Sequence, residues 1–145
     1  MRRCDNDRMA ETLSSEQYSA IVIDHFNHPR NAGSLPDANA EAFVTNPVCG
    51  DSMRIFLRID RGAQGDRIAA ASFLSSGCPA SIATSSVATE LVVGRTAEEA
   101  EALTRDDYAA AVGGLPASKV HCSVLAAAAV RNAIALWRTQ QQPAP

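Results

Sequence analysis

The sequence predicts an α+β domain: a small antiparallel three-stranded sheet with helices packed on one face, an N-terminal helix and a C-terminal helical half. Period-two alternation of apolar residues runs through the middle third of the chain, and helical spacing replaces it after residue 78. Short turn-forming segments separate the strand candidates, which favours a meander of neighbouring strands. Because strands come first and most helices afterwards, helices and strands are expected to segregate into two layers.

A first helix is predicted over residues 14–26. Ser14 and Gln17 have the spacing of a capping box. Pro29 and the loop-forming segment "RNAGSLPDANA" end the helix. Its apolar face consists of Tyr18, Ile21, Val22 and Phe26.

Three strands are predicted, over residues 41–45, 52–60 and 67–76. The second alternates strictly, which indicates one covered face and one mostly solvated face. The covered face comprises Met53, Ile55, Leu57 and Ile59. The solvated face comprises Arg54, Phe56 and Arg58, and its two arginines are interpreted as solvated charges rather than as a docking patch.

Four helices are predicted in the C-terminal half. The first has Pro79 at its first position and stops at Gly94. The second, over residues 96–103, opens with a capping box from Thr96 to Glu99, and a short helix follows over residues 105–112. The last begins at about Ser118 or Val120 and runs to Trp137; its middle is apolar nearly all round, which predicts that it is covered on more than one side.

The chain has 145 residues, which suits a single domain over residues 14–138 between a disordered leader, residues 1–13, and a disordered tail, residues 139–145. A net charge of −3 gives no basic face for nucleic acid. Arg131 and Asn132 interrupt the longest apolar run, so no membrane span is expected. The start of the chain lacks an apolar segment and carries acidic residues, which favours a cytoplasmic protein with reduced thiols.

The four cysteines carry no zinc-finger spacing, because Cys49, Cys78 and Cys122 are far apart and Cys4 lies in the polar leader. Buried or incidental thiols are therefore one interpretation. However, the three later cysteines all fall where predicted elements end. Cys49 occupies the turn "NPVCGD", Cys78 is the expected N-cap before Pro79, and Cys122 lies in the first turn of the last helix.

The start of a helix carries unpaired N–H groups and a partial positive charge, which should lower the pKa of a thiol placed there. His121 precedes Cys122 directly, and Asp51 follows Cys49 by two residues. If these groups converge in space, three thiols, an imidazole and a carboxylate could surround one metal ion or cluster. Without convergence, Asp51 would serve only to cap its turn. His25 and His28 share a helix face, but their place near a helix end explains them more simply than metal binding does.

Four segments resemble the U-type iron–sulfur cluster assembly scaffolds, IscU and the N-terminal domain of NifU. They are "YSAIVIDHFNHPRNAGS", "NPVCGD", "SSGCPASIATSSVATELVVGRT" and "LPASKVHCSVLAAAAVRNAI", and together they span roughly residues 18–138. The order and separation of "CGD", "GC" and "K.HCS" make the resemblance specific.

The resemblance implies a set of site residues. The family's cluster cysteines correspond to Cys49, Cys78 and Cys122, with Cys122 as the expected persulfide acceptor. Its auxiliary ligands correspond to Asp51 and His121, and its auxiliary lysine is matched in Lys119.

The resemblance also implies a function, that of a scaffold rather than an enzyme. Such a scaffold takes sulfur from a cysteine desulfurase, binds Fe(II), builds a labile [2Fe-2S] cluster and transfers it to acceptor apo-proteins. Zn(II) can occupy the same site in purified members. A ferredoxin and a frataxin-like protein are further expected partners, and the chain is expected to be a monomer or weak homo-oligomer. In place of the family's LPPVK, this chain has "LPASK" at residues 115–119, which makes recognition by an Hsp70-type chaperone doubtful.

Two alternatives remain at this point. The SufU branch, a zinc-dependent sulfur acceptor, carries an insertion between its second and third cysteines and lacks the histidine. Here the interval from Cys78 to Cys122 is short and His121 is present, which favours the IscU/NifU branch. The other alternative is a non-catalytic domain with a closed structural zinc site.

Overall fold

The computed structural model describes residues 18–47, 50–63 and 65–141. The predicted leader and the proposed Ser14–Gln17 capping box lie outside the described residues, as do Cys4, Cys49 and the last four residues of the predicted tail.

The sheet has three antiparallel strands in the order β1-β2-β3. They are β1 (Ala40–Thr45), β2 (Ser52–Asp60) and β3 (Arg67–Ser76). Ile55 at the centre of β2 lies opposite Ala42 on one side and Phe73 on the other. The predicted meander is therefore confirmed, since period-two alternation and short connections suffice to place strands of this kind.

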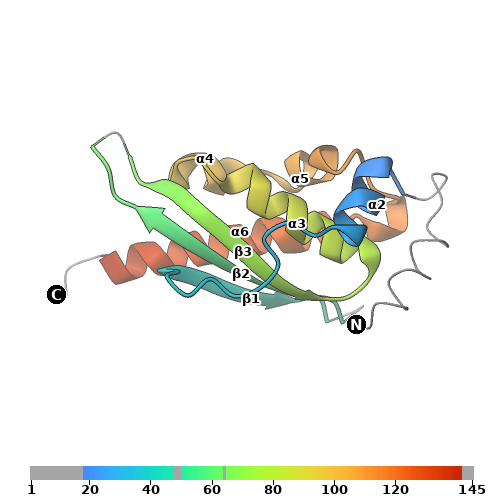
Figure 1. Cartoon of the computed structure of the whole chain (residues 1–145), viewed down its shortest axis with the longest axis horizontal. Coiled ribbons are helices and arrows are strands. Elements are labelled where there is room, and N and C mark those ends of the chain that lie inside the picture. The colour runs from blue at the N-terminus through green and yellow to red at the C-terminus, as the bar shows by residue number, and fades with distance from the viewer. Residues whose placement is uncertain (1–17, 48–49, 64, 142–145) are drawn as a thin grey trace.

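Helices cover one face of this sheet. Figure 1 shows α6 running along the length of the sheet, with α3 beside it and α2 packed on α3 near the N-terminal end of α6. The predicted α+β class with segregated layers is confirmed. The helices are α2 (Ala20–Asn27), α3 (Pro79–Val92), α4 (Ala97–Ala102), α5 (Arg105–Ala111) and α6 (His121–Gln141), with a 3-10 turn η1 (Ala117–Lys119) before α6.

The main core lies between the sheet and α6. The predicted inner face of β2 is fully buried, as are Ile134 and Trp137 on α6. By length and composition alone the stretch Ala117–Gln140 could cross a membrane, contrary to the sequence prediction, because only one charged position interrupts its apolar middle. Its packing on β1 and β2 is that of a core helix.

The first predicted helix begins at Ala20, later than the predicted start at residue 14. Tyr18 and Ser19 precede the helix, and the Ser19 hydroxyl accepts a hydrogen bond from the Val22 amide as the N-cap. An oxygen at this position satisfies one of the free N–H groups of the first turn, so Ser19 sets the boundary of α2.

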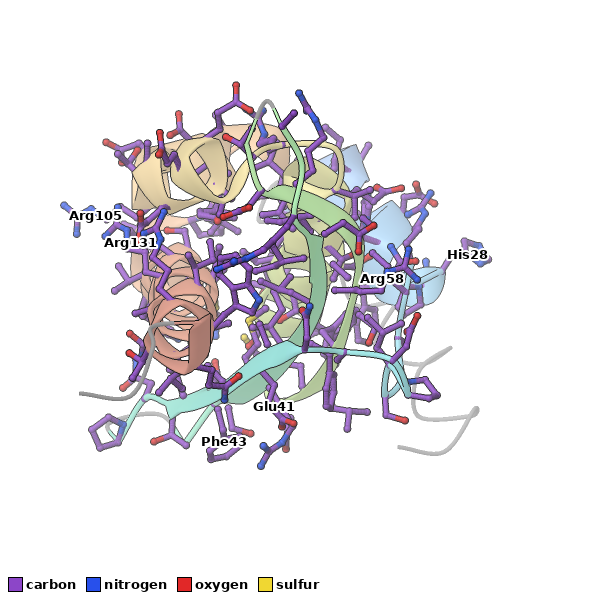
Figure 2. All side chains as sticks on the ribbon, turned by 90° about the vertical axis from the view of Figure 1, so that its left-hand side faces the viewer. His28, Glu41, Phe43, Arg58, Arg105 and Arg131 are labelled. Carbon is purple, nitrogen blue, oxygen red and sulfur yellow. The ribbon has the colours of Figure 1, made fainter. Side chains whose placement is uncertain are left out.

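The prediction that Phe56 faces solvent is wrong. Its side chain is only 8 % exposed, whereas Phe43 on the same outer face of the sheet is 52 % exposed. The segment between α2 and β1 explains the difference, because it crosses this face. It bonds to the outer edge of β3 at Phe73, and its Asp37 pairs with Arg58 at 2.6 Å before Asn39 joins β2. Figure 2 shows Glu41 and Phe43 pointing from β1 away from the helices.

The two phenylalanines provide a matched test of this arrangement. Phe56→Ala is expected to lower the free energy of unfolding by about 3 kcal/mol or more, because it empties a covered position. Phe43→Ala should cost about 1 kcal/mol or less, most of it from its contact with the Arg54 guanidinium 4.9 Å from the ring centre. Urea denaturation of both variants measures the difference. Equal losses would contradict the covering role of the segment between α2 and β1.

Candidate metal centre

The site forms where the β2–β3 hairpin ends and two helices begin. Antiparallel pairing places Ser52 opposite Ser76, so the residues that flank them, Asp51 and Gly77, are neighbours. The turn before β2 is closed by backbone hydrogen bonds from Gly50 to Asn46 and from Asn46 to Asp51. Gly50 has a φ of +79°, which favours glycine and lets the chain reverse there.

Gly77 lets the carboxylate of Asp51 approach the β3–α3 loop. A Cβ atom at residue 77 would lie 2.4 Å from Asp51 Oδ1, which is a severe overlap. Only glycine fits this contact without a shift. Asp51 is consequently buried, with 6 % of the residue exposed, and its carboxylate points at the thiols rather than at its own turn. The structure therefore does not support the interpretation of Asp51 as a turn cap.

The carboxylate of Asp51 is the centre of the cluster. Its Oδ2 atom lies 3.6 Å from Cys78 Sγ, 3.9 Å from Cys122 Sγ and 3.3 Å from His121 Nε2. The two thiol sulfurs are 3.9 Å apart. Within the described part of the chain, Asp51, His121 and Cys122 form the group whose ligand atoms all lie within 4.8 Å of one another, and Cys78 adds a second thiol beside it.

Two helix starts hold the thiols in place. Cys78 is the N-cap of α3 with Pro79 at the first helical position, as predicted, and its side chain makes no capping hydrogen bond. The Sγ atom is therefore free to face the site. His121 and Cys122 are the first two residues of α6, after η1 turns the chain through a bond from Lys119 N–H to Pro116 O.

The two thiols have pKa values shifted in opposite directions. The pKa of Cys78 is lowered to about 6, chiefly because the Cys122 S–H donates to its thiolate. The pKa of Cys122 is raised, because it is the donor in that bond and is buried. The predicted lowering of the pKa is thus found at Cys78, where the partner thiol rather than the helix start is the main cause, and is wrong for Cys122. Two adjacent thiolates repel each other, so the first ionisation opposes the second.

Lys119 adds a positive charge near the pair. Its ammonium group lowers the pKa of both thiols, although other effects outweigh it at Cys122. The structure thus brings Lys119 into the electrostatic field of the thiols, as the sequence position suggested. Cys49, the remaining predicted ligand, lies outside the described residues.

A small apolar cluster lies beneath the site. It joins α2 to the first turns of α3 and includes Cys122 itself, which is 2 % exposed, whereas Cys78 is half-buried and His121 lies on the more open side. The cluster consists of Tyr18, Val22, Ala80, Ala83, Val87, Val112 and Cys122. The site is therefore apolar and buried on the side of Cys122 and open to solvent on the side of His121.

The other two histidines lie elsewhere. His25 is buried, its Nδ1 lies 2.8 Å from the Ser86 hydroxyl, and burial lowers its pKa; it fastens α2 to α3. His28 is exposed and points outward (Figure 2). Neither joins the site. The structural role of Gly77 is the feature that sequence reasoning missed, although its place directly before Cys78 was the available indication.

The donor set suits a soft or borderline metal. Thiolate and imidazole ligands favour zinc, iron and iron–sulfur clusters, and the carboxylate adds a harder oxygen. Fold and site together define a class of small α+β proteins that present cysteine, histidine and aspartate at one end of a sheet for metal binding.

Comparison with known proteins identifies the family. Residues 17–144 match the model of the NifU-like N terminal domain, and the chain belongs to that family. The iron–sulfur cluster assembly scaffold protein IscU 1 of Archaeoglobus fulgidus is 51 % identical over 117 residues, which cover 81 % of this chain and 74 % of the relative. The scaffold protein IscU of Escherichia coli is 40 % identical over 130 residues, covering 86 % and 97 % respectively.

The fold is also found among solved structures. A NifU-like N-terminal protein from Brucella abortus superposes with a TM-score of 0.71 at 18 % identity, and the match covers 88 % of this chain and 98 % of that one. At this identity the likeness concerns the fold alone.

The tight contact at Gly77 predicts a ligand-specific effect. Gly77→Ala should displace the Asp51 carboxylate and weaken Zn(II) binding about tenfold or more, as loss of an oriented ligand does. Competition with a chromogenic chelator measures the affinity. Gly94→Ala is the matched control: Gly94 also has a positive φ, but open space surrounds its Cβ position, so zinc affinity should stay unchanged while stability falls. Equal zinc affinities in the two variants would contradict the role of Gly77.

Proposed function

We propose that this protein is a scaffold on which an iron–sulfur cluster is assembled and from which it is passed to other proteins. One observation carries the proposal. The side chains of Cys78, Cys122 and His121 all lie within hydrogen-bonding reach of one carboxylate oxygen of Asp51, and the two thiols lie within reach of each other. Family membership and relatives named as assembly scaffolds support it. Chain connectivity keeps Cys49 two residues from Asp51, and it is proposed as the third cysteine ligand.

Sulfur would arrive from a cysteine desulfurase as a persulfide. A thiolate of this chain attacks the terminal sulfur of the donor persulfide, a new S–S bond forms, and the donor thiolate leaves. Cys122 is the proposed holder of this sulfur. Its place in the apolar cluster supports this assignment, because burial shields a persulfide from thiols in solution.

Iron and sulfur are cargo in this proposal, a [2Fe-2S] cluster being the expected product and Fe(II) the form in which iron enters. Zn(II) would compete for the same ligands. A permanent site would use thiolates throughout, whereas Asp51 and His121 supply harder ligands that exchange more readily. His121 lies at the open side, so an acceptor protein could displace it first. Lys119 would offset part of the negative charge that the ligands bring together.

The proposed partners are a cysteine desulfurase and acceptor apo-proteins, with a ferredoxin and a frataxin-like protein as further partners, in the cytoplasm. An Hsp70-type chaperone stays outside the proposal. Ala117–Lys119 form a 3-10 turn that fixes the start of α6, so a groove for extended peptide would require this turn to unfold. No observation favours the zinc-dependent sulfur-acceptor alternative, and His121 lies at the site, where that branch lacks a histidine.

Anaerobic assembly tests the function. The protein is mixed with a cysteine desulfurase, cysteine, Fe(II) and a reductant, and visible absorption and Mössbauer spectra are recorded. A [2Fe-2S] spectrum is expected for the wild type and for Cys4→Ser, the control that removes a cysteine outside the proposed site. Cys78→Ser and Cys122→Ser should each abolish or strongly reduce it, because each removes a ligand. Tight zinc binding with no cluster spectrum in the wild type would contradict the proposal.

The cluster of an Asp51→Ala variant should persist longer under chelator challenge than that of the wild type, because the harder ligand that promotes release is gone. The decay of visible absorption after addition of a chelator measures this. Unchanged or faster decay would remove Asp51 from the release step.

A further inference from the structure

Cys78 and Cys122 lie close enough to react with each other. Both are free thiols in the structure, and their sulfurs are 3.9 Å apart. A disulfide requires a separation of about 2.05 Å, so the sulfurs would have to approach each other by roughly 2 Å. They belong to different helix starts, 44 residues apart, so the fold itself creates this pair.

We infer that, in the metal-free protein, Cys78 releases the sulfur held on Cys122 as hydrosulfide by closing a Cys78–Cys122 disulfide. The inference rests on the proposed function, since it takes the Cys122 persulfide from it. It adds an activity to that function: the chain would itself reduce persulfide sulfur to the sulfide that a cluster contains.

The reaction balances without an external reductant. The Cys78 thiolate attacks Sγ of the Cys122 persulfide, and the Cys78–Cys122 S–S bond forms as the bond between Cys122 Sγ and the outer sulfur breaks. The outer sulfur leaves as HS⁻ and carries away the electron pair of that bond. The two cysteine sulfurs are oxidised together by two electrons, and the sulfane sulfur is reduced by two.

The geometry favours attack on the inner sulfur, because the 3.9 Å distance joins the two Sγ atoms. Attack on the outer sulfur would only move the persulfide from one cysteine to the other. Hydrosulfide is also the conjugate base of a stronger acid than a cysteine thiol, so it is the better leaving group.

Cys78 and Cys122 differ in ways that suit the first to attack and the second to hold the persulfide. Cys78 is half-buried and its side chain makes no capping bond, so it can rotate toward its neighbour. Cys122 is buried within the apolar cluster, where its persulfide is held in place for attack.

The disulfide must be reduced by a thiol, such as a small dithiol or a protein dithiol, before the next round. Bound metal would engage both sulfurs, so the reaction belongs to the stage before metal enters. Sulfide production and metal occupancy would then exclude each other at this pair.

The test loads persulfide onto the metal-free protein without oxygen or reductant. A cysteine desulfurase with cysteine serves as one donor and inorganic polysulfide as the other, each in the presence of a chelator and each removed by gel filtration. Released sulfide is then measured over time, and disulfides and persulfides are mapped by mass spectrometry of alkylated peptides. The proteins compared are the wild type, Cys78→Ser and Cys4→Ser, the last as a matched removal of a cysteine outside the proposed site.

The wild type and Cys4→Ser should release about one sulfide per chain and acquire the Cys78–Cys122 disulfide. Cys78→Ser should retain the persulfide on Cys122 and release sulfide at least about tenfold more slowly. A wild-type persulfide as long-lived as that of Cys78→Ser would overturn the inference, and so would a disulfide to Cys49 in place of Cys78.

These results are separable from the proposed function. If polysulfide, but not the desulfurase, yields the disulfide and sulfide, the inference stands and the proposed sulfur donor is wrong. If the wild type keeps a stable persulfide from the desulfurase and still builds clusters when iron and reductant are added, the proposed function stands and the inference is wrong.

Discussion

The contact between Asp51 and the glycine that precedes Cys78 is the constraint on which the site depends. Because residue 77 has no side chain, a carboxylate can enter the space at the end of the hairpin and reach both thiols and the imidazole with one oxygen. The contact joins the start of β2 to the start of α3, and the Asp51 carboxylate reaches from there to His121 and Cys122 at the start of α6. Elements far apart in the sequence thereby meet at one group of ligands, and the separation of the cysteines along the chain becomes irrelevant.

The rest of the fold holds the starts of β2, α3 and α6 in fixed positions relative to one another. α6 packs along the inner face of the sheet, and its buried length anchors His121 and Cys122 at one end. The antiparallel pairing of β2 with β3 fixes Asp51 relative to Cys78. A well-packed core therefore holds the backbone, while the ligands sit on element ends, where side chains can exchange partners. This division suits a protein that must bind a cargo firmly enough to build it and loosely enough to release it.

Sequence reasoning predicted the strands, the order of the layers and the placement of Cys78 and Cys122 at helix starts, because alternation, capping residues and Pro79 are local features. It failed where contacts with distant segments determine the burial or the pKa of a residue. Phe56 is buried on the outer face of the sheet, which the segment between α2 and β1 crosses, and an alternating pattern does not reveal this. The raised pKa of Cys122 comes chiefly from a thiol 44 residues away and from burial, and its position at a helix start reveals neither. Convergence of the ligands required the fold, and the resemblance to a known family supplied it in advance.

Cobalt(II) titration of the metal-free protein tests most directly whether these residues form one metal centre. The thiolate-to-cobalt charge-transfer absorption reports the number of coordinated sulfurs. Cys78→Ser and Cys122→Ser should each lose one thiolate's share of that absorption, His121→Ala should alter the visible ligand-field bands without losing that share, and Cys4→Ser should leave both unchanged. Full charge-transfer intensity in either Cys78→Ser or Cys122→Ser would contradict a shared centre.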